Sequence, residues 1–295
     1  MKTDFSGIAA ALVTPYTTQG DVNYSELRKL VRYLIKKGID GFYVCGSTAE
    51  VFLLTPEERK AILEAVVEEN NGEKFVIAHV GQISTDMAID MAVHAKSAGA
   101  DAISSISPFY YPFTGDEIKN YYFDIMDYSD MPMFIYNFPK FSGFNLTNEI
   151  LTEFRQNPHV IGVKFTSNDF FQMERMKTMH PDLVILNGYD EMLLSGLAAG
   201  ADGGIGSTYN CMSPLIRRIY DNQRAGNYNM ARSYQQQVNH VIEIMVKYGV
   251  FGSVKALLEM QGFSFNGCRK PFAPVPAQGI TELRAVHEKY ITPLL

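Results

Sequence analysis

Short apolar runs rich in β-branched residues alternate with longer segments of helical period along residues 1–225. The runs predict eight strands. These are residues 8–13, 41–45, 75–80, 102–106, 133–136, 160–164, 183–186 and 203–206. Strands that alternate with helices are typical of a parallel α/β fold, and eight such units indicate a closed (β/α)8 TIM barrel. A doubly wound open sheet uses the same units in another spatial order and stays an alternative.

The segments between the strands carry the signals of helix ends. Asn23 followed by Glu26, and the run Thr55-Pro56-Glu57-Glu58, are capping patterns that begin a helix. Glycine, which ends a helix in the left-handed conformation without a steric penalty, recurs before a strand in a Gly-x-Asp triplet. The triplets occupy residues 38–40, 99–101 and 200–202. This weak repeat favours a repeated strand-helix unit.

The strand pattern stops after residue 225. Residues 229–248 and 253–260 have helical period, and only helices are expected after the proline-rich stretch 271–276. We therefore expect a barrel at residues 1–225 and a C-terminal helical extension at residues 226–295. No low-complexity linker separates the two, so the extension is expected to pack on the barrel.

Charge and composition exclude several classes of protein. Lys and Arg number 26 against 32 Asp and Glu, a net charge of −6, which argues against nucleic-acid binding. Residues 1–7 lack an apolar signal core and no apolar run is long enough for a membrane span, so we expect a cytoplasmic protein. Cys45, Cys211 and Cys268 lack metal-ligand or disulfide-frame spacing. The 6 histidines also lack such spacing, and we expect no metal.

Lys164 is the first candidate for chemistry, because the active site of a barrel lies at the carboxyl ends of its strands. Lys164 ends the apolar run 160–163, so burial would disfavour its ammonium form and lower its pKa. A neutral amine is what imine formation with a ketone requires. The alternative is an ordinary lysine that reaches solvent. Lys140 lies in a predicted loop and Lys255 in a helix outside the barrel, so neither has an equally apolar approach.

Other strand ends offer polar groups that could face the same mouth. Tyr136 could act as an acid or base if a nearby cation lowers its pKa from about 10; alternatively it is a packing residue. Ser47 and Thr48 offer hydroxyls and backbone N–H groups that suit a carboxylate, although an ordinary turn would bond to itself. Carboxylates and serines can bind several hydroxyls of a polyol. Asp190, Glu191 and Ser207 form such a set, but the first two equally suit a helix N-terminus.

Five motifs in order along the chain carry a family resemblance. They are Gly46-Ser47-Thr48-Ala49-Glu50, Tyr136-Asn137-Phe138-Pro139, Gly162-Val163-Lys164, Asn187-Gly188-Tyr189-Asp190-Glu191 and Gly203-Gly204-Ile205-Gly206-Ser207-Thr208. Together they resemble the N-acetylneuraminate lyase subgroup of the dihydrodipicolinate synthase superfamily. The resemblance covers essentially the whole chain. It implies a class I aldolase on a (β/α)8 barrel, usually a homotetramer, that needs no cofactor.

The resemblance also implies a role for each motif. Lys164 would form a Schiff base with the C2 ketone of N-acetylneuraminate, and Tyr136 would take the C4 hydroxyl proton as the C3–C4 bond breaks. The products would be N-acetylmannosamine and pyruvate, in a reversible reaction. The remaining implied roles are carboxylate binding by Ser47 and Thr48, lining of the site by Thr166, binding of the sugar tail by Gly188, Asp190, Glu191 and Ser207, and reach into a neighbouring subunit's site by Tyr110.

Two departures from the superfamily pattern bear on function. Ala49 replaces the second glycine of the usual Gly-Ser-Thr-Gly-Glu, and alanine would strain the turn by roughly a kcal/mol if that position needs a positive φ. Phe141 stands where the synthase branch carries an arginine for a second carboxylate, which argues against a dihydrodipicolinate synthase. An aldolase for 2-keto-3-deoxy sugar acids and a non-catalytic sugar-binding or keto-acid-binding barrel stay as alternatives.

Overall fold

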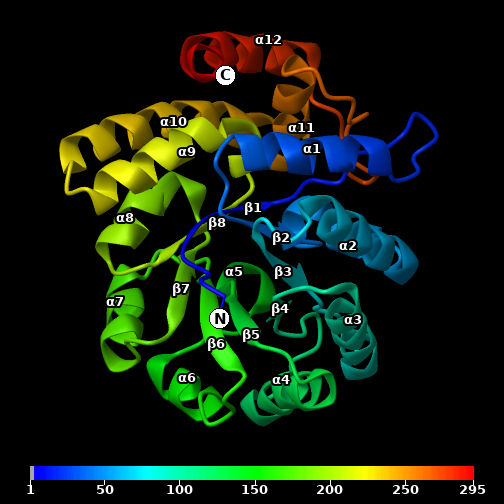
Figure 1. The fold of residues 1–295 in the computed structure, drawn as a ribbon, viewed down its shortest axis with the longest axis vertical. Helices are drawn as coiled ribbons and strands as arrows, with labels where there is room; N and C mark the ends of the chain where they lie inside the picture. The colour runs from blue at the N-terminus through cyan, green and yellow to red at the C-terminus, as the bar shows by residue number, and fades with distance from the viewer. Residues whose placement is uncertain (1–2) are drawn as a thin grey trace.

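A computed structural model describes residues 3–295, and its centre is a closed barrel of eight parallel strands (Figure 1). The strands are β1 Gly7–Ala11, β2 Gly41–Val44, β3 Phe75–His79, β4 Ala102–Ile106, β5 Met133–Asn137, β6 Val160–Phe165, β7 Val184–Asn187 and β8 Gly203–Gly206. Each strand pairs with the next along the chain, and β1 also pairs with β8, from Gly7 opposite Gly203 to Ala10 opposite Gly206. The (β/α)8 barrel is confirmed, and the open doubly wound sheet is wrong.

Helices surround the strands (Figure 1). They are α1 Tyr24–Lys36, α2 Pro56–Asn70, α3 Thr85–Ala98, α4 Gly115–Ser129, α5 Pro139–Ser142, α6 Asn148–Phe154, α7 Phe170–Met179, α8 Leu193–Ala198, α9 Tyr209–Arg224, α10 Tyr228–Tyr248, α11 Val250–Met260 and α12 Ala277–Val286. Of these, α10, α11 and α12 lie together on one side of the molecule, with α12 outermost (Figure 1). Short helical turns occupy Ser47–Ala49 (η1), Val51–Leu53 (η2), Asp190–Met192 (η3), His287–Ile291 (η4) and Thr292–Leu294 (η5).

The predicted helix ends are confirmed. Asn23 Oδ1 accepts a hydrogen bond from the Glu26 N–H at 3.2 Å, and Thr55 with Glu58 forms a reciprocal capping box ahead of α2. The three recurring glycines all have left-handed backbones: Gly38, Gly99 and Gly200 have φ of 84°, 90° and 104°. Local chemistry therefore decides where these helices begin and end.

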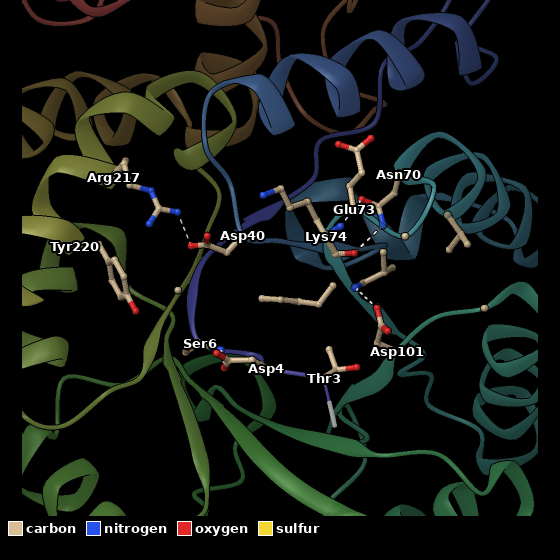
Figure 2. A pocket seen from close by; sticks show the side chains of 16 residues that line it. Thr3, Asp4, Ser6, Asp40, Asn70, Glu73, Lys74, Asp101, Arg217 and Tyr220 are labelled. Atoms are coloured by element: carbon tan, nitrogen blue, oxygen red, sulfur yellow. Dashed lines mark hydrogen bonds and ion pairs between the residues drawn. The ribbon is translucent and has the colours of Figure 1, made fainter. Parts of the chain in front are cut away.

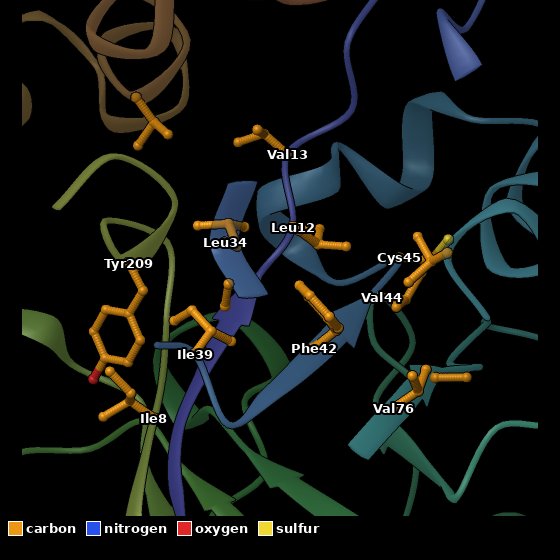
Figure 3. Packing of buried hydrophobic residues seen from close by; sticks show 14 of the residues in the cluster. Ile8, Leu12, Val13, Leu34, Ile39, Phe42, Val44, Cys45, Val76 and Tyr209 are labelled. Atoms are coloured by element: carbon orange, nitrogen blue, oxygen red, sulfur yellow. The ribbon is translucent and has the colours of Figure 1, made fainter. Parts of the chain in front are cut away.

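Buried apolar side chains fill two zones. One zone lies between the strands and the helices, where Leu34 and Ile39 pack near Phe42 (Figure 3). The other lies inside the barrel, where the Phe5 ring contacts Phe75 and Phe134 with ring centroids 5.3 and 5.2 Å apart. The interior is thus a packed core, which leaves the polar groups at the carboxyl ends of the strands to form a site.

The C-terminal helices pack against the barrel. Helix α10 lies along α9 (Figure 1), and its buried residues Val238, Val241 and Met245 belong to the same apolar cluster as the barrel helices. The domain boundary at residue 225 stays a prediction. No helix within residues 3–295 is both long and apolar enough to cross a membrane.

Candidate active site

Lys164 and Tyr136 lie side by side at the carboxyl ends of β6 and β5. The two residues are direct partners in the register of the parallel pair, and each is only 4% exposed. The Lys164 Nζ lies 4.1 Å from the centre of the Tyr136 ring and 3.9 Å from that of Tyr43. The structure therefore encloses the amine between two aromatic faces at the mouth of the barrel.

The environment of Lys164 favours the neutral amine. Burial lowers the pKa of Lys164 from 10.5 to about 7, and the nearby Asp190 carboxylate only partly opposes this change. The ring faces attract an ammonium ion, but they cannot replace the water that burial removes. A large share of the protein thus holds a nucleophilic amine at neutral pH.

The free site does not meet the condition set for Tyr136, namely that a nearby cation lowers its pKa. Burial dominates and raises the pKa of Tyr136 to about 12, while the hydroxyls of Ser47 and Thr166 oppose the rise. Because Lys164 is itself largely able to lose its proton, it is a weak source of positive charge. Tyr136 therefore rests as a protonated phenol that can donate a hydrogen bond to a substrate oxygen.

The turn after β2 presents Ser47 and Thr48 toward the barrel mouth. Thr48 Oγ1 and Ser207 Oγ are 2.7 Å apart, so the loops after β2 and β8 meet at these two hydroxyls. Ala49 lies in the η1 turn and is absent from the described residues with positive φ. The left-handed residues lie on either side of the turn: Cys45 has φ 57° and Glu50 has φ 61°. The strain considered for alanine at position 49 therefore does not arise.

The loops after β6 and β7 bring the remaining predicted residues together. Gly188 lies against Thr166, since a Cβ on Gly188 would collide with Thr166 Oγ1. That hydroxyl is buried and makes no close hydrogen bond within residues 3–295, although it lies near enough to the Tyr136 phenol to oppose the rise of its pKa. Asp190 is buried, accepts a hydrogen bond from the Thr208 N–H at 2.8 Å, and has its pKa raised to about 7 by burial. The unpaired hydroxyl is a group that a polar substrate can satisfy.

Two predicted residues lie farther from this centre. Glu191 is partly exposed, and its backbone carbonyl accepts a hydrogen bond from Asn239 Nδ2 at 3.2 Å. Tyr110 is 85% exposed and has φ 80°. Its ring contacts Tyr111, with centroids 5.1 Å apart.

The sequence predicted that Lys255 has a less apolar environment than Lys164, and this prediction is wrong. Lys255 is more deeply buried than Lys164, with a side chain only 1% exposed, but its Nζ lies 2.5 Å from Glu50 Oε1. The Nζ also donates to the Gly267 carbonyl at 2.7 Å, so Lys255 is held by two partners away from Tyr136 and is not free to attack a ketone. Lys140 is exposed, and it lies in the short helix α5 rather than in the predicted loop.

Sequence reasoning missed the residues beneath Lys164. Tyr43 forms one wall of the amine pocket, and its hydroxyl lies 3.1 Å from Ser104 Oγ. His79 is buried, with Nδ1 3.1 Å from the Cys45 carbonyl and Nε2 accepting from the Ile106 N–H at 3.3 Å. Burial holds the pKa of His79 well below its usual value, so the ring stays neutral. Both residues occupy apolar strands, where the sequence carries no sign of their partners.

An apolar cleft of about 500 Å³ adjoins Ser47 at the mouth of the barrel. Its lining is mostly aromatic and includes Phe52, Phe109, Phe141, Phe251 and Phe272. Phe141 is 66% exposed, and its ring packs on Phe138 with centroids 4.5 Å apart. The position that carries arginine in the synthase branch is therefore part of an apolar wall.

A second cavity of about 500 Å³ lies at the opposite, N-terminal ends of the strands (Figure 2). Its charged groups hold the fold together: Asp40 accepts from the Ile8 N–H at 2.8 Å and pairs with Arg217, and Asp101 accepts from the Val76 N–H at 2.8 Å. This end of a barrel serves stability rather than catalysis. Residues 3–295 contain no group of three His, Cys, Asp or Glu side chains placed to hold a metal.

Fold and site together define a (β/α)8-barrel protein with a buried, readily deprotonated lysine at its carboxyl mouth. The model of the dihydrodipicolinate synthetase family matches residues 4–289, and the chain belongs to this family.

Several members of this family that are similar to the chain have named activities or ligands. An N-acetylneuraminate lyase from Shigella boydii serotype 4 is 44% identical over 98% of each chain. The structure of CdNal from Clostridium difficile, in complex with mannosamine, has a TM-score of 0.95 at 35% identity and covers 98% of this chain and 100% of the other. The structure of a catalytic lysine mutant of the Ruminococcus gnavus sialic acid aldolase has a TM-score of 0.92 at 30% identity and covers 97% of this chain and 98% of the other.

Proposed function

We propose that the protein is a class I aldolase that reversibly cleaves N-acetylneuraminate to N-acetylmannosamine and pyruvate. The observation that carries the proposal is the buried Lys164 amine, with a pKa lowered to about 7, beside the Tyr136 phenol. The similarity to N-acetylneuraminate lyase along 98% of both chains supports this substrate. Phe141, in an apolar wall, disfavours a second substrate carboxylate and hence the synthase reaction.

The proposed reaction starts when neutral Lys164 attacks the C2 ketone of the open-chain sugar acid. Tyr136 donates its phenol proton to the carbinolamine hydroxyl, which leaves as water, and this step yields a protonated imine and a Tyr136 phenolate. The imine's positive charge close to the ring lowers the pKa of Tyr136 below its resting value of about 12 and stabilises the phenolate. Tyr136 can then take the C4 hydroxyl proton. The C3–C4 bond breaks, its electrons move into the imine, and N-acetylmannosamine leaves as an aldehyde. Protonation of the enamine at C3 and hydrolysis release pyruvate and free Lys164.

The other loops would hold the two ends of the substrate. Ser47 and Thr48 would bind the carboxylate through hydroxyls and backbone N–H groups, next to Tyr136. The buried Thr166 Oγ1 would gain a partner in a sugar hydroxyl. The sugar tail would be held by Gly188, Asp190, Glu191 and Ser207. The hydrogen bond between Thr48 and Ser207 would fix the position of the carboxylate site relative to the sugar site.

We further propose a homotetramer in the cytoplasm, with Tyr110 reaching into a neighbouring subunit's site. Support comes from Tyr110, a large ring that is 85% exposed on a left-handed backbone, and from three free cysteines, which suit a reducing compartment. Light scattering coupled to gel filtration tests the assembly. A monomer that turns over at the full rate would remove the proposed role of Tyr110.

Borohydride trapping tests attachment and cleavage together. N-acetylneuraminate is the only carbonyl compound added, and intact mass and a peptide map locate the reduced adduct. We expect a pyruvate-sized adduct on the peptide that contains Lys164, and none without the sugar acid. An adduct with the whole sugar would mean binding without cleavage. If N-acetylneuraminate gives no adduct while pyruvate alone does, the aldolase chemistry stands and the sialic-acid substrate is rejected.

A further inference from the structure

A buried ion pair joins the C-terminal helices to the turn that carries Ser47 and Thr48. Lys255 of α11 places its Nζ 2.5 Å from Glu50 Oε1, and the two side chains are 1% and 0% exposed. The second Glu50 oxygen, Oε2, accepts a hydrogen bond from the Arg269 N–H at 2.7 Å. Both carboxylate oxygens of Glu50 are therefore held by the C-terminal part of the chain.

The ammonium group is equally well enclosed. Lys255 Nζ donates a second hydrogen bond to the Gly267 carbonyl at 2.7 Å, and it lies 4.2 Å from the centre of the Tyr16 ring. Removing water from two charges is costly, and a hydrophobic pair of similar volume would often be as stable. Stability alone therefore gives no reason for an ion pair at this place.

The geometry of the turn supplies a reason. Glu50 has φ 61°, a backbone conformation that is unfavourable for any residue with a Cβ. Its N–H donates to the Ser47 carbonyl at 3.0 Å, so the left-handed backbone of Glu50 closes the η1 turn that presents Ser47 and Thr48. Fixing the Glu50 side chain from outside the barrel holds this backbone in place.

We infer that Lys255 is a positioning residue for the keto acid: its ion pair with Glu50 holds the Ser47-Thr48 turn in the shape that binds the substrate carboxylate. This inference rests on the proposed function, because it takes that turn as the carboxylate site. Lys255 touches no substrate. It acts through Glu50, so its loss should weaken binding of the keto acid rather than the chemistry of the Lys164 amine.

Pyruvate is the probe that isolates this effect, because it carries the carboxylate and the ketone but no sugar tail. The full-length Lys255→Met variant is titrated with pyruvate under borohydride trapping. The adduct on Lys164 is measured against pyruvate concentration. We expect the half-saturating concentration to rise at least about tenfold, since a displacement of about 1 Å can cost 10²-fold. The maximal trapping rate should stay within about threefold.

Two further variants keep the test decisive. Lys247→Met removes another lysine of the C-terminal helices, whose Nζ lies 2.9 Å from Glu282 Oε2 on α12 rather than near the turn, and it should leave the titration unchanged. The double variant Glu50→Gln with Lys255→Met leaves no unpaired buried charge and keeps an acceptor for the Arg269 N–H. It should fold even if the single variant does not, and it should show the same raised half-saturation.

The outcomes separate this inference from the proposed function. If the native protein gives no pyruvate adduct, the Schiff-base function fails and the inference fails with it. If the native protein is trapped and a folded variant half-saturates within about twofold of it, the aldolase chemistry stands and the positioning role is rejected. A lower maximal rate with unchanged half-saturation would mean loss of folded protein only, and it would also reject the role.

Discussion

The lowered pKa of Lys164 predicts imine formation in a pH range where an ordinary lysine is nearly inert. Burial moves this pKa from 10.5 to about 7. At pH 7 about half of the protein therefore carries the neutral amine, against about one molecule in three thousand for an unperturbed lysine. Single-turnover formation of the pyruvate adduct should rise about tenfold per pH unit below pH 6 and level off above about pH 8. The adduct is quenched with borohydride at set times and quantified by intact mass.

Asp190→Asn tests whether burial and the charge of Asp190 together set the pKa of Lys164. The Asp190 carboxylate raises the pKa of Lys164 and so opposes the effect of burial. Its removal should move the midpoint of the pH profile to lower pH. Glu191→Gln is the matched control, because Glu191 is partly exposed and does not contribute to the lowered pKa. A native midpoint near 10, or a midpoint that moves upward in Asp190→Asn, would refute the reasoning.

Three more predictions follow from the same site. Tyr136→Phe should lower kcat by about two to four powers of ten, the usual size of a general acid-base contribution; near-normal turnover in a steady-state assay would remove Tyr136 from the mechanism. Turnover should survive EDTA, because the imine itself accepts the electrons of the broken bond; a rate that is lost and then restored by metal would indicate a class II mechanism. Lys164→Met should raise the free energy of unfolding by about 2–4 kcal/mol at pH 7. The native pKa of Lys164 lies below its unfolded value, so the unfolded chain binds more protons between the two. Native stability thus rises with pH in that window, and the advantage of methionine should vanish above about pH 10.5 in urea titrations. An advantage independent of pH would contradict this prediction.

Local patterns in the sequence determined the strands, the helix ends and the first candidate residue. Helix caps such as Thr55 with Glu58 and glycines such as Gly38 interact only with residues close to them in the sequence. Their effects can therefore be predicted before the fold is known. Lys164 could be singled out for the same reason, because four apolar residues precede it in its strand. The roles of Gly188, Thr166 and the sugar-binding residues came from the family resemblance.

Tertiary structure decided what depends on residues distant in the chain. Closure of the sheet rests on β1 pairing with β8, and the rise rather than fall of the Tyr136 pKa rests on how completely neighbouring elements exclude water. The left-handed residues around the turn proved to be Cys45 and Glu50 instead of residue 49, and Lys255 proved to be the buried partner of Glu50, 205 positions away. Solvation and charge pairing are sums over all neighbours in space. A sequence states which groups exist, but only the folded chain decides which of them lose water and which meet.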